Sequence, residues 1–103
     1  MTVQRTHIGH QTRYELRDGG VLSCVLTYGG AEIEPAVWKI LLPGPDGTED
    51  LYGTDRFLAP TAPLLRAWLA PIVGDDRAAA LASAVDAAPP KPSGWLQNDS
   101  ETG

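Results

Sequence analysis

The spacing of apolar residues changes once along this chain, from a period of two to a period near 3.6. Alternation of apolar and polar residues is typical of a strand with one buried face, whereas offsets of three and four place residues on one stripe of a helix. The helical spacing begins after Thr61. The switch therefore predicts an α+β domain, in which an antiparallel three- to four-stranded sheet is followed by two helices packed on one face.

The alternating part of the chain divides at turn residues. Gly9 marks a bulge or a bend, Asp18-Gly19-Gly20 supplies a hairpin turn, and Pro35 interrupts the later alternation. The predicted strands, in chain order, are residues 6–17, 21–28 and 36–42, with a short fourth strand at Leu51 and Tyr52.

The helical part predicts two segments. Thr61 is placed to cap a first helix, whose apolar stripe contains Leu64, Leu65, Trp68, Leu69 and Ile72. Pro71 lacks an amide hydrogen and should end or kink this helix just before it. A second helix is expected over 77–88, capped by Asp75 or Asp76. We expect a single domain over residues 1–88 and a disordered tail, rich in proline, serine and acids, over 89–103.

Composition limits the classes of partner. The 103 residues include 13 acidic and 8 basic side chains, so the net charge is −5. No basic cluster offsets that charge, which argues against direct nucleic-acid binding and against an anionic membrane surface. Cys24 is the single cysteine, the N-terminal residues lack an apolar leader, and the most apolar stretch is interrupted by Arg66 and prolines. These features predict a cytoplasmic protein without a membrane span.

Candidate catalytic groups all have simpler interpretations. His7 and His10 point to opposite faces of one predicted strand, so they do not converge on a metal. Cys24 lies among apolar residues, where a thiol is usually inert. The paired acids are interpreted as solvated strand positions or helix caps, and the glycine pairs as turns because neither fits a phosphate-binding motif. We therefore assign no catalytic residue, no metal site and no cofactor.

The second face of the sheet offers a better candidate site. Two short helices cover only one face, and the opposite face is more apolar than a wet face usually is. The tail adds a tryptophan and a leucine that cannot form a core of their own. The predicted partner-binding residues are Val25, Val37, Lys39, Leu41, Trp95 and Leu96. Shielding of that face by the tail, by the loop 53–60 or by charges at its rim is the alternative.

These features favour a small acidic, non-catalytic interaction or regulatory protein that acts through protein–protein contacts, with a second copy of the chain, as in a homodimer, among its candidate partners. One alternative is a ligand-binding protein or small enzyme whose pocket, between sheet and helices, is lined by His10, Cys24 or Tyr14. The other is an acidic mimic that blocks a nucleic-acid-binding protein.

Overall fold

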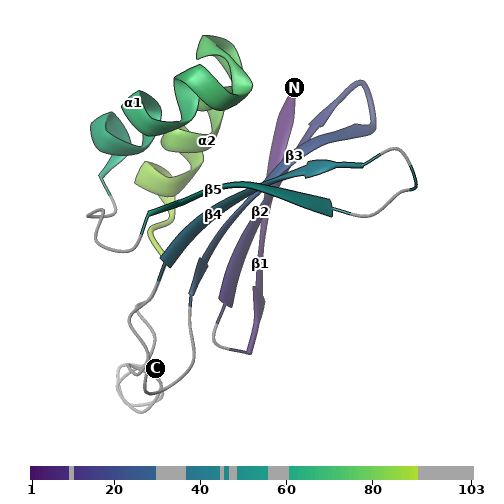
Figure 1. Ribbon diagram of the computed structural model, residues 1–103. Coiled ribbons are helices and arrows are strands. Elements are labelled where there is room, and N and C mark those ends of the chain that lie inside the picture. The colour runs from purple at the N-terminus through teal and green to yellow at the C-terminus, as the bar shows by residue number, and fades with distance from the viewer. Residues whose placement is uncertain (10, 30–36, 45, 47–48, 56–60, 91–103) are drawn as a thin grey trace.

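The chain forms one antiparallel sheet followed by two helices, in the α+β class (Figure 1). The computed structural model describes residues 1–9, 11–29, 37–44, 46, 49–55 and 61–90. Its elements are β1 (Thr2–Ile8), β2 (Gln11–Asp18), β3 (Val21–Gly29), β4 (Val37–Pro43), β5 (Glu49–Asp55), α1 (Ala62–Val73) and α2 (Asp75–Ala87). None of the described helices is long and apolar enough to cross a membrane.

The sheet has five strands in the order β1-β2-β3-β4-β5, so the prediction of three to four strands was too low. The predicted strand over 6–17 is in fact two strands, β1 and β2, that separate at Gly9. Gly9 has a φ of 59°, which a glycine adopts without the steric cost that a side chain imposes. β1 also begins earlier than predicted, at Thr2. The sequence did not indicate this start because Val3 is the one described apolar side chain of β1 that packs against the core, so the strand shows little alternation.

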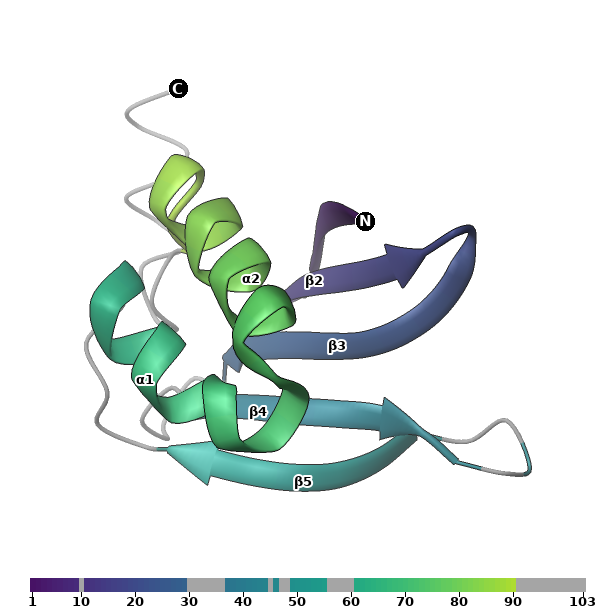
Figure 2. The same cartoon turned by 90° about the horizontal axis from the view of Figure 1, so that it is seen from above.

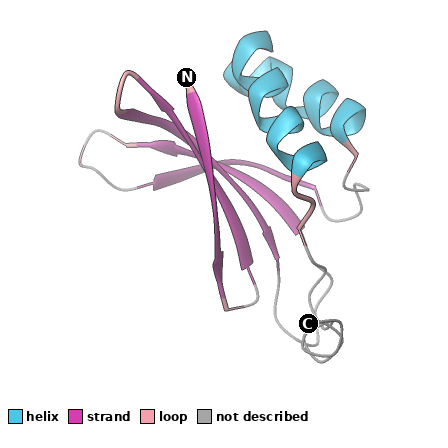
Figure 3. Cartoon of the chain, turned by 180° about the vertical axis from the view of Figure 1, so that it is seen from behind, coloured by secondary structure: helices cyan, strands magenta, loops and turns pink. Residues whose placement is uncertain are grey.

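The two helices cover the same face of the sheet, as predicted (Figure 2). The sheet contributes to the core the residues Tyr14, Leu16, Cys24, Leu26, Trp38 and Ile40, and the helices contribute Leu65, Leu69, Leu81 and Val85. Tyr28 lies against Trp38, with ring centroids 4.5 Å apart and planes tilted by 47°. We call this side of the sheet the helix face and the other side the open face; Figure 3 views the same two layers from behind.

The helix boundaries differ from the prediction at the junction between α1 and α2. α1 continues through Pro71 to Val73, and α2 starts at Asp75. Gly74, at φ 96° and ψ 157°, joins them: its amide donates to the Ala70 carbonyl at 2.9 Å, and its carbonyl accepts from the Ala78 amide at 2.9 Å. Pro71 has no amide hydrogen to donate to the carbonyl four residues earlier, so α1 loses one of its bonds there and ends two residues later.

A bulge in β5 determines what the open face presents. Ile40 pairs with Gly53, and Leu41 pairs with Leu51, so Tyr52 is an extra residue in β5. At such a bulge two residues of one strand lie opposite one residue of its neighbour. Leu51 and Tyr52 therefore lie together opposite Leu41, on the open face.

Candidate interaction surface

The structure places the predicted partner-binding residues at different depths. Val25 has no exposed surface and Val37 is 8% exposed, whereas Lys39 and Leu41 are partly exposed. Val25 lies in the central strand, with Glu15 of β2 on one side and Leu41 of β4 on the other. Trp95 and Leu96 lie outside the described residues. Of the predicted set, Lys39 and Leu41 are thus the described residues that reach the surface.

One half of the open face is covered by charges of both signs. Along β2, Arg13 Nε donates to Glu15 Oε2 at 2.9 Å, and Arg17 Nη2 donates to Glu15 Oε1 at 3.0 Å. These hydrogen bonds, that of Arg13 above all, hold the pKa of the Glu15 carboxyl below its usual value. A carboxylate shared by two guanidinium groups leaves this half polar, and it offers little to an apolar partner.

The other half of the open face contains three neighbouring apolar side chains. Leu51 is 56% exposed and Tyr52 is 57% exposed, and both adjoin the partly buried Leu41. We call these three residues the β5 patch. The sequence predicts a strand at Leu51 and Tyr52 but assigns them no face, because the extra residue of the bulge breaks the alternation that assigns a face. The signal in the sequence was two large apolar residues side by side in a short edge segment.

The histidine that the structure describes does not form a catalytic pair. His7 Nδ1 lies 3.0 Å from Thr12 Oγ1, and His7 Nε2 lies 3.3 Å from Arg5 Nη1. A guanidinium can only donate, so His7 Nε2 accepts a hydrogen bond from Arg5. Nδ1 then carries the hydrogen and donates a hydrogen bond to the Thr12 hydroxyl oxygen. In this tautomer His7 has no lone pair available to activate the Thr12 hydroxyl. His10 lies outside the described residues.

Cys24 and Tyr14 are core residues. Burial raises the pKa of the Cys24 thiol to about 11 and that of Tyr14 to about 12, so both groups are protonated near neutral pH. A protonated thiol is a poor nucleophile. The Tyr14 hydroxyl donates to the Ala88 carbonyl at 2.6 Å. Neither residue has exposed surface, although Cys24 lies at the wall of a hollow of about 340 Å³ that Ser23 and Leu42 also line.

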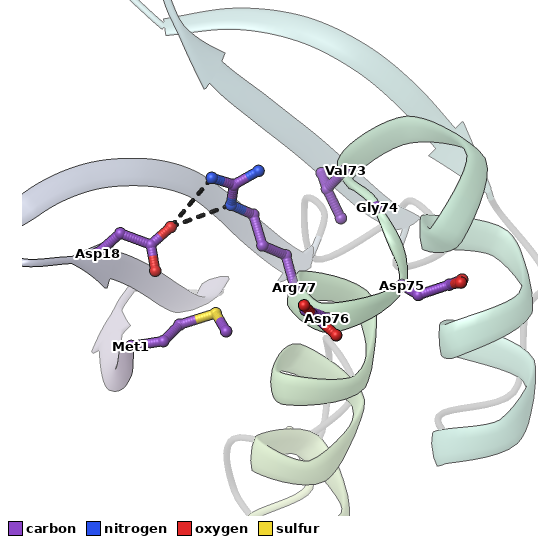
Figure 4. Close-up of a pocket in the computed structure, with 7 residues that line it drawn as sticks. All are labelled: Met1, Asp18, Val73, Gly74, Asp75, Asp76 and Arg77. Carbon is purple, nitrogen blue, oxygen red and sulfur yellow. Dashed lines mark hydrogen bonds and ion pairs between the residues drawn. The ribbon is translucent and has the colours of Figure 1, made fainter.

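A hollow of about 540 Å³ lies where the β2–β3 turn meets the start of α2 (Figure 4). Its lining includes Met1, Asp76 and the ion pair in which Arg77 Nε and Nη2 both lie 3.1 Å from Asp18 Oδ2. That pairing engages the guanidinium with a carboxylate inside the chain. Within the described ranges, no group of three or more His, Cys, Asp or Glu side chains could hold a metal ion.

Comparisons of this chain with protein-family models, with curated proteins and with solved structures found no match.

Proposed function

We propose that this chain is a small non-catalytic protein that acts through protein–protein contacts made by its open face at the β5 patch. The observation that supports the proposal is the exposure of Leu51 and Tyr52, side by side and next to Leu41. Tyrosine is enriched at energetically dominant interface positions, because it buries a large rigid area while its hydroxyl keeps a polar contact.

The surroundings of the patch fit the centre and rim of an interface. Burial of exposed apolar surface favours association, and the three apolar side chains lie together on two adjacent strands. Lys39 is partly exposed on the same face and pairs with Thr54 of β5, so a positive charge and a hydroxyl lie beside the patch. Polar and charged groups at the rim of an interface select partners and orient them.

The two alternatives have less support. The ligand-binding alternative relied in part on Tyr14 and Cys24, which are core residues. The mimic alternative needs acids gathered on one face, whereas Asp50 lies on β5, and Asp75 and Asp86 lie at the two ends of α2.

A site-specific photo-crosslinker tests the proposal in cells of the native host. The crosslinker replaces Tyr52 in one variant and Leu64, which is 47% exposed on α1, in a matched control. We expect a discrete crosslinked protein species from position 52, and its loss when Leu51→Asp is added. Equal crosslinking from both positions, or none from position 52, would contradict the proposal.

A further inference from the structure

The described sheet has two edge strands. The strand order makes β1 and β5 the outermost strands (Figure 1), and among the described elements neither has a neighbour on its outer side. An unprotected edge strand has free amide and carbonyl groups that can pair with another strand. Each edge also exposes large apolar side chains: Ile8 is 59% exposed on β1, and Leu51 and Tyr52 are exposed on β5.

The two edges carry opposite charge. β1 contains Arg5 and His7 and no acidic residue, whereas β5 contains three acids and no basic residue (sequence EDLYGTD). Like charges oppose the pairing of β5 with a second β5, and Arg5 opposes the close approach of two β1 strands in a centred register. The charges instead favour the pairing of β1 with β5.

The directions of the two edge strands are also compatible with pairing. All neighbouring strands are antiparallel, so β1 and β5 run in the same direction. When a second copy continues the sheet with its helices on the same side, β5 of one copy therefore meets β1 of the next in parallel orientation.

In that arrangement each face of the junction contains complementary side chains. Asp50 pairs with Leu42, and Arg5 pairs with Tyr14, so both lie on the helix face. Ile8 lies on the open face, as do Leu51 and Tyr52, because it is an odd number of residues from Arg5 along the strand. A register that sets Asp50 beside Arg5 places acid beside base on the helix face, and on the open face it places Ile8 two residues along β1 from Thr6, the residue beside Leu51.

The geometry points to head-to-tail assembly of this chain, in which β5 of one copy adds to β1 of the next and the sheets become continuous. The inference rests on the proposed function, since it names a second copy of the chain as the partner that covers the β5 patch. A contact between two different surfaces leaves one of each free, so it continues into a filament or closes into a ring. The twist of the sheet decides between these two outcomes.

Charge reversal of the purified full-length chain tests the inference. We expect the sedimentation coefficient of the wild type to rise with concentration at low salt and to fall in 1 M salt, where the screening length is about 3 Å. Arg5→Glu and Asp50→Arg should each weaken association at least about tenfold, because each places like charges across the junction. An equimolar mixture of the two variants should restore assembly, because every junction in an alternating array then pairs opposite charges.

Matched controls make the same two kinds of charge reversal at positions away from the edges of the sheet. Arg66→Glu on α1 and Asp86→Arg on α2 alter exposed side chains and should leave assembly at the wild-type level. Circular dichroism shows whether each variant keeps its fold. A wild type that stays monomeric at all concentrations would overturn the inference, as would assembly that survives both edge variants or fails to return on mixing. Crosslinking of Tyr52 to a different protein would leave the proposed function intact even if this inference failed.

Discussion

The Tyr14 hydroxyl connects β2 to the C-terminal end of α2 through one hydrogen bond. Its hydrogen bond to the Ala88 carbonyl spans 74 positions of the chain, and the tyrosine has no exposed surface. Ala88 follows the last residue of α2, where carbonyl groups lack partners within the helix. The alternation of the sequence could place Tyr14 on a face, but no local pattern could identify an acceptor so distant.

Tyr14→Phe should lower the free energy of unfolding by about 1–2 kcal/mol, because it leaves the Ala88 carbonyl without its donor. Urea denaturation at neutral pH measures the change. Tyr52→Phe makes the same chemical change at an exposed position and should be nearly neutral. Equal stability of the two variants would show that the Ala88 contact contributes nothing.

At the scale of secondary-structure elements, the sequence predicted the types of element better than their boundaries. The period of two located β3 and β4 and the period of 3.6 located α1, since each of these buries one clear stripe. β1 was predicted only over its last three residues and not as a separate strand, because its exposed side chains show little apolar alternation. The bulge at Ser23 likewise pairs Leu22 with Arg17 and removes it from the face of Cys24, which simple alternation could not indicate.

The residues of the candidate site were likewise predictable only in part. The open face was predicted from the number of helices, and Leu41 does reach its surface. Val25 and Val37 are buried instead, because burial depends on neighbouring strands whose register a single sequence does not fix. The exposure of Leu51 and Tyr52 depends on one inserted residue, and nothing in their own chemistry distinguishes an exposed pair from a buried one.

Gly53→Ala tests the packing of α1 on β5. A Cβ at this position would lie 3.1 Å from Ile72 Cδ1, 3.1 Å from Trp68 Cζ2 and 3.2 Å from Ile40 Cγ2. We expect a loss of about 1–2 kcal/mol in unfolding free energy, because three packed side chains must move. The loss should shrink in an Ile72→Val background, which removes one of the crowded atoms. An unchanged loss in that background would mean that the crowding lies elsewhere.

Gly74→Ala tests the junction of the two helices by a different mechanism. A Cβ there would meet no atom within 4 Å, but φ 96° with ψ 157° is a conformation almost confined to glycine. The backbone alone should therefore cost about 1–3 kcal/mol, measured by thermal or urea unfolding. Ile72→Val should leave this cost unchanged, in contrast to its effect on Gly53→Ala. A neutral Gly74→Ala would show that the junction adopts another backbone conformation at no cost.

At the scale of the whole molecule, the sheet carries its charge unevenly. The basic residues of β1 and the acids of β5 lie at opposite edges, while the ion pairs of Glu15 balance the charge of β2 between them. Net charge alone describes this chain as acidic and does not show that one edge is basic. The strand order places the basic strand β1 at one edge of the sheet and the acidic strand β5 at the other, so the two edges carry opposite charge.

The core as a whole should resist acid better than alkali, because two of its titratable groups are buried in their protonated forms. Burial raises the pKa of Cys24 from about 9 to about 11, and that of Tyr14 from about 10 to about 12. A group whose pKa is higher in the folded state contributes stability below its unfolded pKa and loses it as pH rises through the folded pKa. We expect unfolding free energy to fall between about pH 9 and pH 12, by about 3 kcal/mol for each group. Urea denaturation across this range measures the decline, and Cys24→Ala should move its onset up by about one pH unit, because the groups that remain, Tyr14 and Tyr28, are tyrosines whose pKa burial raises from an ordinary value of about 10. If the pH at which stability begins to fall is the same in Cys24→Ala as in the wild type, burial does not raise the pKa of the thiol and some other group governs alkaline unfolding.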